Sequence, residues 1–540
     1  MEGVVHIIAN CKIEKFNHSI FQLAIYSGFS ELFRAIISAM TLLIKNAQII
    51  DGTGGEPFKG DVLVKNDRIS AIGSLGRQKA GKTIQAAGLY IAPGFIDCNT
   101  DSDHYLTLFA NPEQQDFLLQ GVTTIIGGLC GSSLAPLIYG SLESIRKWAN
   151  PGLVNVNWHS VAEFLATISR RKLGVNFGTF IGHSTVRRAL LGENLRDLTL
   201  GELQVFEKIL SDALKEGAFG LSSGLGYIHG RGTPYSEMAD LLKIVSRHGG
   251  LYATHLRSET NGLIESVKET LNLSREAGIT SIINHLRPLK GYEAEYGECL
   301  DLISARVDES DLYFDVYPFE SSHVTMYSLL PLWAQSSNLE TMLSSIKNPS
   351  TRKKIVEELK RLNGADITIA SAGANSFLVG KTVKEFAAGR GVSEAEALVL
   401  TMEMTGLKAT VFHKDVDYPL AVKALAHNRS LVSSNTASFP AGSIISERRT
   451  TFIKFLDLII KKNLIPLELG IKKITSKPAE IMKLSRRGLI REGYIADLVV
   501  FSADAGTGAE IQHVLVNGQP VVLNKNFNGS REGAVLRLEK

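Results

Sequence analysis

The stretch GGLYATHLRSETNGLIESVKETLNLSREAGITSIINHLRP (residues 249–288) contains the pattern that decides the fold. It begins with a short apolar run of strand character (249–257), continues with helical periodicity (262–278), and ends in a second apolar run (280–288). Strand and helix alternate in this way along most of the chain. Each of the two strands ends on a polar side chain that binds metals well, His255 in the first and His285 in the second.

Eight apolar runs of strand character succeed one another, mostly separated by segments long enough for a helix. The runs are 89–99, 121–130, 173–183, 217–225, 249–257, 280–288, 311–319 and 430–436. Eight alternations of strand and helix predict an α/β protein built on a (β/α)8, or TIM, barrel. More than 100 residues separate the seventh and eighth runs. We therefore expect an insertion before the last barrel strand, at about residues 335–428, as a subdomain or a lid.

The two ends of the chain are rich in short strands and turns. Residues 40–92 and 480–540 alternate apolar runs with turn residues such as Asp-Gly and Gly-Gly. Domain ends often lie close together, so the two pieces are expected to pair as one small β-sandwich. Residues 93–479 then form the barrel. Residues 1–39 lack this regular alternation and are expected to be an extension outside the core; an amphipathic helix packed on the body is the alternative.

Composition limits the class of protein. Of 540 residues, 44% are hydrophobic and 21% charged, which are globular values and exclude a disordered chain. Lys and Arg (58) nearly balance Asp and Glu (55), so the net charge of +3 gives no support for nucleic-acid binding. The most apolar segment, 20–44, carries Glu31 and Arg34 near its middle, which disfavours a membrane span. We expect a cytoplasmic protein acting on a small molecule; its oligomeric state stays open.

Three side chains at strand ends have the types that a zinc site needs. Cys130 ends the second run, His255 the fifth and His285 the sixth. Active sites of such barrels lie at the carboxyl ends of the strands. One thiolate and two imidazoles there would bind zinc with one position left open. A catalytic zinc activates water and polarises a carbonyl, so such a site can hydrolyse an amide.

With these motifs in order, the chain resembles the amidohydrolase superfamily and, within it, the D-aminoacylases (N-acyl-D-amino-acid deacylases), over roughly residues 40–530. The matching pieces are NAQIIDGTG (46–54), PGFIDCNTD (93–101), QGVTTIIGGLCGSSLAPL (120–137), GHSTVR (182–187), GAFGLSSGLGY (217–227), THLRSE (254–259), NHLRP (284–288), VYPF (316–319), ITSKPAEIMKL (474–484) and GYIADLVVF (493–501). The resemblance implies a barrel hydrolase with a flanking β-sandwich and one tightly held zinc, bound by Cys130, His255 and His285. It also implies that Arg287 and Tyr317 handle the substrate, Arg287 by binding its carboxylate.

The sequence departs from the family pattern at three positions. Asn99 and Asp101 stand where the family has a His-x-His pair that holds a second metal, and Asn435 stands where it has the proton-transferring Asp. An amide is not basic near neutral pH, so Asn435 cannot take a proton from water. Asp101 can still bind a metal through oxygen. Asp101, Asp103 and His104 are the alternatives for the base.

Two functions are consistent with this pattern. The first is a zinc-dependent hydrolase of linear amide bonds, best matched to N-acyl-D-amino acids, with Asp101 or another carboxylate moving the proton. The second is a catalytically impaired pseudoenzyme that keeps the fold and binds a small acidic ligand. Asn99 and Asn435 are the residues that divide the two.

Overall fold

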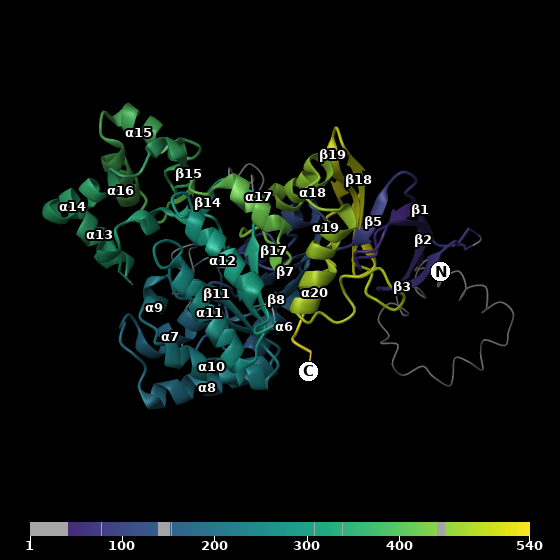
Figure 1. The fold of residues 1–540 in the computed structure, drawn as a ribbon, viewed down its shortest axis with the longest axis horizontal. Coiled ribbons are helices and arrows are strands. Elements are labelled where there is room, and N and C mark those ends of the chain that lie inside the picture. The colour runs from purple at the N-terminus through teal and green to yellow at the C-terminus, as the bar shows by residue number, and fades with distance from the viewer. Residues whose placement is uncertain are drawn as a thin grey trace.

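The computed structural model describes residues 41–76, 78–138, 149, 152, 154–306, 308–336, 338–439 and 449–539. The expected extension, 1–39, lies outside these residues. The described chain has three parts: a central body of strands and helices, a sheet made from both chain ends, and a helical insertion (Figure 1). Within these ranges no helix combines the length and the apolar character that crossing a bilayer requires.

The central body is built from parallel strands, and each of the eight expected runs contributes to it. The strands are β6 (Phe95–Asp97), β7 (Val122–Gly127), β8 (Asn176–Thr179), β9 (Ile181–Gly182), β10 (Gly220–Gly224), β11 (Leu251–His255), β12 (Ser281–Ile283), β13 (Leu312–Val316) and β17 (Ser430–Val432). They form two sheets, β6-β7-β8 and β17-β13-β12-β11-β10-β9. Backbone hydrogen bonds join the sheets at both ends: Phe219 N donates to Thr179 O (2.9 Å) and Asn435 N to Asn99 O (3.0 Å).

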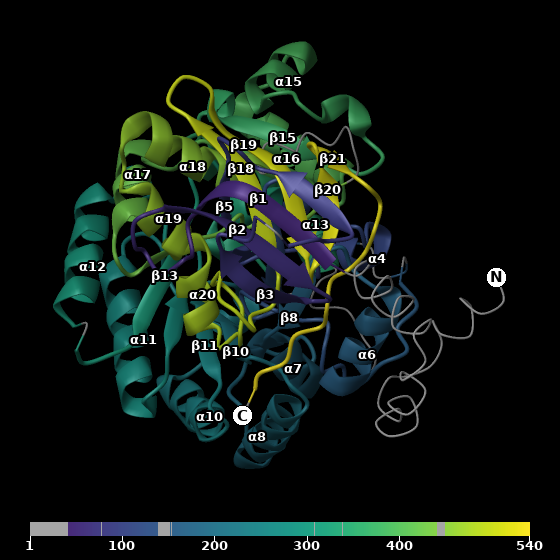
Figure 2. The same cartoon turned by 90° about the vertical axis from the view of Figure 1, so that its right-hand side faces the viewer.

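Helices cover the outside of these strands, as a view from the side of the terminal sheet shows (Figure 2). They are α4 (Thr107–Ala110), α5 (Gln115–Leu118), α6 (Val161–Arg171), α7 (His183–Leu191), α8 (Leu200–Lys215), α9 (Ile228–Arg231), α10 (Tyr235–Arg247), α11 (Leu263–Ala277), α12 (Glu293–Ala305), α17 (Tyr418–Ala426), α18 (Thr451–Lys462), α19 (Leu467–Ile474) and α20 (Ser476–Ile481). Local sequence sets their ends. Capping boxes start α6 (Ser160 with Glu163) and α8 (Thr199 with Glu202), and Gly278 ends α11 in the left-handed conformation.

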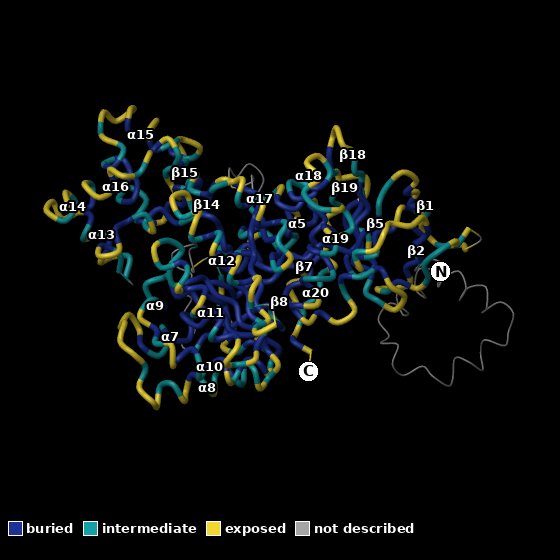
Figure 3. Tube along the Cα trace, in the orientation of Figure 1, coloured by how far each residue is buried: buried dark blue, intermediate teal, exposed yellow. Residues whose placement is uncertain are grey.

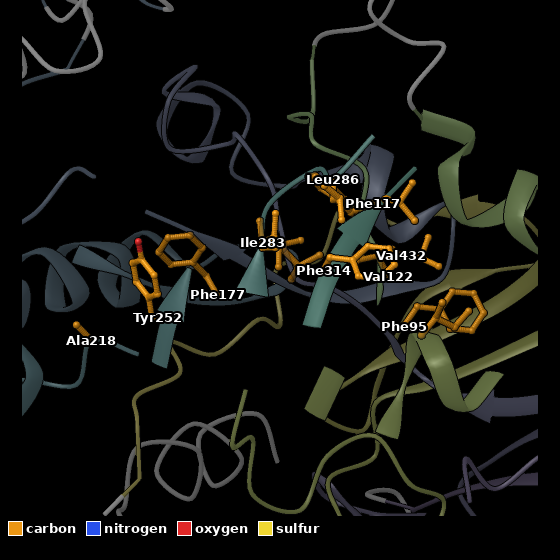
Figure 4. Close-up of a cluster of buried hydrophobic side chains, with 14 of the residues drawn as sticks. Phe95, Phe117, Val122, Phe177, Ala218, Tyr252, Ile283, Leu286, Phe314 and Val432 are labelled. Atoms are coloured by element: carbon orange, nitrogen blue, oxygen red, sulfur yellow. The ribbon is translucent and has the colours of Figure 1, made fainter. Parts of the chain in front are cut away.

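Between strands and helices lies a continuous apolar core. The tube drawn by burial is dark through this region, while exposed residues gather on the helices at the rim (Figure 3). Phe95, Phe177 and Phe314 belong to this core, and the close-up shows them with other buried side chains of the strands (Figure 4). Burying a large side chain of this kind contributes about 1.5–3 kcal/mol. The core therefore fixes the strand ends that carry the polar residues.

Strands from the two chain ends pair in one nine-stranded sheet. Its members are β1 (Thr41–Ile49), β2 (Phe58–Lys65), β3 (Arg68–Gly73), β4 (Lys82–Gln85), β5 (Tyr90–Pro93), β18 (Leu498–Asp504), β19 (Gly508–Val516), β20 (Gln519–Leu523) and β21 (Asn526–Phe527). The junction is the antiparallel pair β5 and β18, with Ala92 opposite Val499. The last residues leave this sheet, since Leu536 N donates to Phe177 O (2.8 Å) in the central body.

The first expected run, 89–99, is divided between two sheets. Residues before Gly94 form β5 of the terminal sheet, and residues after it form β6 of the central body. A Cβ at Gly94 would lie 2.1 Å from Thr123 Oγ1, so the chain passes β7 too closely for any side chain. Glycine at this position thus lets one apolar run serve both sheets.

The insertion has its own core and begins earlier than the expected residue 335. It contains β14 (Ser322–Thr325), β15 (Ile367–Ser371), β16 (Thr410–His413), α13 (Leu339–Lys347), α14 (Pro349–Leu359), α15 (Val383–Arg390), α16 (Glu394–Met404) and short 3₁₀ turns. Its apolar cluster runs from Met326 to Val411. The expected limits, 335–428, are corrected at both ends: β14 pairs with the distant β16, and α17 packs on β13 and β17 of the central body. Neither contact is visible in local periodicity.

Candidate metal centre

Cys130, His255 and His285 come together at the carboxyl ends of three parallel strands. Cys130 follows β7, His255 is the last residue of β11, and His285 follows β12. Their possible ligand atoms all lie within 4.8 Å of one another, and all three residues are buried. Cys130 Sγ lies 3.4 Å from His285 Nε2, which lies 3.0 Å from His255 Nδ1. Residues spread over 155 positions of sequence thus form one group.

The size and chemistry of this group fit a zinc ion. Tetrahedral zinc at ordinary bond lengths separates two nitrogens by about 3.4 Å, and a sulfur from a nitrogen by about 3.6 Å. The observed separations of 3.0 and 3.4 Å are close to these values. Cys130 is a free thiol. A soft thiolate with two imidazoles is the donor set of a zinc site that keeps an open position.

The backbone at this site adopts a conformation that few side chains tolerate. Cys130 (φ 51°), His285 (φ 38°) and Asn435 (φ 47°) all lie in the left-handed region. Such positions cost of order 1–3 kcal/mol each, and they persist where the surrounding structure enforces them. Each of the three follows a strand of the central body. The fold therefore holds these side chains in position although their backbone conformation is unfavourable.

Glu259 belongs to the candidate site, and the sequence reasoning did not single it out. Its carboxylate faces the outer nitrogen of both histidines, at 3.4 Å from His285 Nδ1 and 3.8 Å from His255 Nε2. Burial opposes ionisation of Glu259, but Arg287 and the two histidines hold its pKa well below the usual range. A carboxylate behind ligating histidines orients the rings and fixes their protonation. The sequence does contain a hint of this contact, because in THLRSE the acidic residue Glu259 lies only four positions after His255.

Arg287 and Tyr317, the expected substrate-binding pair, lie side by side behind Glu259. Arg287 Nη2 donates to Glu259 Oε2 (2.7 Å), and Arg287 Nη1 donates to the Tyr317 hydroxyl (3.4 Å). Arg287 lines the cavity, and its Nε is buried without a hydrogen-bond partner among the described residues. Tyr317 is buried and is not among the residues that line the cavity, and its hydroxyl contacts Arg287, which does line it.

Among the alternatives for the base, Asp101 and His104 form a pair at the cavity wall. Asp101 Oδ1 lies 2.9 Å from His104 Nδ1, and His104 Nε2 lies 3.1 Å from Ser132 O. Burial lowers the pKa of His104, but the carboxylates of Asp103 and Asp101 outweigh it and raise that pKa to about 9. Asp103 points elsewhere: it accepts a hydrogen bond from Gly128 N (2.6 Å) and does not line the cavity. Asp101 is the carboxylate that a ligand can reach.

Asn435 and Asn99 occupy different surroundings. Asn435 is half-buried and lines the cavity. Asn99 is fully buried below it, and its Nδ2 donates to both carboxylate oxygens of Asp315 (3.1 and 3.3 Å). Asn284 Nδ2 (3.1 Å) and the Ser433 hydroxyl donate to the same carboxylate. Asn99 thus belongs to a polar floor centred on Asp315, which the sequence reasoning missed, and not to the group of Cys130.

A cavity of about 570 Å³ opens over the three residues. Its lining comes from the strand ends (Asp101, Cys130, His255, His285, Asn435) and from the insertion (His323, Leu332, His413). This volume is typical of a site for a small organic ligand. His183, another polar residue at a strand end, lies outside the lining and pairs with Glu237 at 2.8 Å.

Known proteins resemble the chain over nearly its whole length. The model of the amidohydrolase family matches residues 444–522. D-aminoacylase from Alcaligenes xylosoxydans xylosoxydans is 29% identical over 511 residues, which are 92% of this chain and 97% of that protein. A crystal structure of D-aminoacylase superposes with a TM-score of 0.76 at 27% identity, covering 92% of this chain and 99% of the other.

A further D-aminoacylase structure concerns its metal centre. It superposes with a TM-score of 0.75 at 26% identity over 92% of this chain and 99% of the other. That work describes a binuclear metal centre in which one metal activates and a second attenuates. The chain is thus similar to D-aminoacylases in sequence and shares their amidohydrolase-type fold.

Proposed function

We propose that this protein is a zinc-dependent hydrolase of linear amide bonds that removes the acyl group from N-acyl-D-amino acids. The observation that carries the proposal is the buried group of Cys130, His255 and His285 at one end of a cavity of ligand size. The similarity to D-aminoacylases supports the substrate class.

The three ligands would hold one zinc, which supplies a Lewis acid that activates water and polarises the amide carbonyl. Glu259 orients the two imidazoles from behind and balances the charge of Arg287. Arg287 lines the cavity, and we assign binding of the substrate carboxylate to its guanidinium. Burial of all three ligands excludes water from one side of the site and strengthens these interactions.

Asp101 is the residue we assign to proton transfer. Its carboxylate lines the cavity together with Cys130, and Asn435 cannot perform this role. His104 holds Asp101 from the other side, which fixes the direction of the carboxylate. We further propose that Asp101 is not a second metal ligand, because it is not in the group of Cys130 and its partner is His104.

The finer architecture belongs to the same proposal. We propose that the nine parallel strands, which come from eight runs of the sequence, form with their helices a closed (β/α)8 barrel within residues 93–479, interrupted by the insertion. The sheet shared by residues 40–92 and 480–540 is taken as the flanking β-sandwich. We also propose a cytoplasmic location.

A pseudoenzyme that binds a small acidic ligand is the second function, and the observation that favours it is Asn435 at the cavity wall. Loss of a general base costs about 10²- to 10⁴-fold in rate. Both functions use the same cavity, so binding alone does not separate them.

The test combines metal content with turnover. Protein expressed in zinc-supplemented medium should contain about one zinc per chain, and removal of zinc should lower its melting temperature. Hydrolysis of N-acetyl-D-leucine, with N-acetyl-L-leucine as the control, should be stereospecific and should stop when zinc is removed. Absence of zinc from folded protein would refute the hydrolase; bound zinc and tight ligand binding without turnover would favour the pseudoenzyme.

A further inference from the structure

The cavity wall carries an arginine whose charge no neighbouring carboxylate of the described residues balances. Of the three arginines in the lining, Arg287 pairs with Glu259 (2.7 Å) and Arg257 with Glu269 (2.7 Å). Arg231, at the end of α9, lies within 4.0 Å of no carboxylate oxygen among the residues that the structure describes. Its Nη2 donates to Gly226 O (3.1 Å), which uses one of the five N–H donors of a guanidinium.

The backbone that carries Arg231 is held in place by Arg257. Arg257 Nη1 donates to Arg231 O (2.6 Å), and Arg257 Nη2 donates to Thr233 O (3.1 Å). Arg257 thus has a structural role, with its charge balanced and its donors used. Arg231 has the fixed backbone but keeps most of its own donors, which is the arrangement of a preorganised anion-binding group.

Arg231 also lies close to the metal group. The carbonyl that accepts its hydrogen bond belongs to Gly226, where a Cβ would lie 2.8 Å from His255 Nε2. The next residue, Tyr227, stacks on the His255 ring with centroids 4.4 Å apart. The hydrogen bond from Arg231 to Gly226 O, the covalent geometry of Gly226 and its contact with His255 Nε2 together limit the distance between the Arg231 guanidinium and the His255 imidazole to about 10 Å. Arg231 and His255 also line the same cavity, so a ligand the size of an acylated amino acid can contact both.

The electrostatics favour an anion at this position. Burial alone lowers the pKa of Arg231, and no carboxylate in the described part of the chain opposes the effect. A partly desolvated cation without a partner is unfavourable, and a ligand anion would relieve that cost. The charge-assisted hydrogen bonds formed by arginine and a carboxylate are the strong kind and can be bidentate.

We propose that Arg231 binds a second carboxylate of the substrate, so that the preferred substrates are N-acyl-D-amino acids carrying two negative charges. One carboxylate is then bound by Arg287 and the other by Arg231. This inference rests on the proposed function and names the substrate class of the same site. The second carboxylate comes either from the amino-acid side chain or from the acyl group.

The test compares pairs of ligands that differ in the presence of a second carboxylate. Binding to the zinc-loaded protein is measured by calorimetry for N-acetyl-D-glutamate and N-acetyl-D-glutamine, and kcat/KM is measured for both. A second pair, N-succinyl-D-alanine and N-butanoyl-D-alanine, tests the acyl group as the source of the carboxylate. We expect a preference of about 10- to 100-fold for the dianion in one of the pairs.

Arg231→Met keeps an apolar stem and should remove this preference, while binding of the monoanionic member of each pair changes less than about twofold. Arg231→Lys should restore part of the preference. Arg247→Met, an exposed arginine outside the cavity, is the matched control and should keep the full preference. Because wild-type protein already reports the preference, the test does not depend on folding of a variant.

Equal binding within both pairs, or a preference that survives in Arg231→Met, would overturn the inference and leave the proposed function standing. Failure of the zinc-loaded wild type to bind or hydrolyse any of these N-acyl-D-amino acids would overturn both. The two failures are thus distinguishable in one set of measurements.

Discussion

Replacing Glu259 by Gln tests whether one carboxylate supports both histidines of the metal group. The carboxylate lies 3.4 Å from His285 Nδ1 and 3.8 Å from His255 Nε2. Loss of such an outer partner typically lowers metal affinity by about 10- to 100-fold. Because a single residue here serves two ligands, we expect a value near 100-fold, or about 2.7 kcal/mol.

The same substitution also leaves Arg287 without its carboxylate. Breaking a buried ion pair costs about 3–5 kcal/mol. Arg287 keeps the Tyr317 hydroxyl and is 9% exposed, so we expect a loss near the lower limit in zinc-free protein. The two effects are separable, since the free energy of unfolding is measured without zinc and the affinity with it.

Zinc affinity is measured by competition with a chromophoric chelator, and stability by urea unfolding of the zinc-free protein. Glu265→Gln is the matched control: Glu265 lies on α11, its side chain is 77% exposed, and its partner is Lys268. The control should match wild type in both measurements. A folded Glu259→Gln protein whose zinc affinity stays within about twofold of wild type would refute the role assigned to this carboxylate.

Three further predictions concern the rest of the site. Because Asp101 is assigned to proton transfer, Asn435→Asp should leave the hydrolysis rate of N-acetyl-D-amino acids nearly unchanged, and a rise of about 10²- to 10⁴-fold would contradict that assignment and show that the wild type lacks a base. Cys130→Ser should lose bound zinc by mass spectrometry of the metal content, whereas Cys299→Ala, a buried cysteine of α12, should retain it. Burial raises the pKa of Asp97 to about 7, above its value in the unfolded chain, so the stability that its protonated form contributes is lost as pH rises from about 4 to 7. The free energy of unfolding in urea should therefore fall less between pH 5 and pH 8 for Asp97→Asn than for wild type.

Local sequence patterns predict the strands of the central body well, because each lies in a short apolar run and most of these runs have a polar residue at or near their end. They miss features that depend on distant contacts. The limits of the insertion depend on pairing between β14 and β16, where His323 lies opposite Phe412, and the division of run 89–99 depends on the contact of Gly94 with Thr123. Neither contact leaves a mark in the periodicity of either segment.

The candidate site shows the same division between local and distant information. The candidate metal group of Cys130, His255 and His285 is predictable from residue type and from position at strand ends. The roles proposed for Glu259 and Arg231 depend on how the arginines and carboxylates around the cavity pair in the folded chain. Sequence spacing does not predict this pairing. Arg287 illustrates the point: its position suggests a free cation, but in the folded chain Glu259 balances its charge.

The departures from the family pattern fall on one side of the site. Cys130, His255, His285 and Glu259 are connected by short contacts, so the side that would bind one zinc is complete. On the other side, Asn99 is engaged by Asp315, which also accepts hydrogen bonds from Asn284 and Ser433. Turning Asn99 toward a metal would leave part of a buried carboxylate unpaired, at a cost of about 1–3 kcal/mol or more. We therefore propose that the polar floor opposes a second metal at this position, in agreement with a site that holds one.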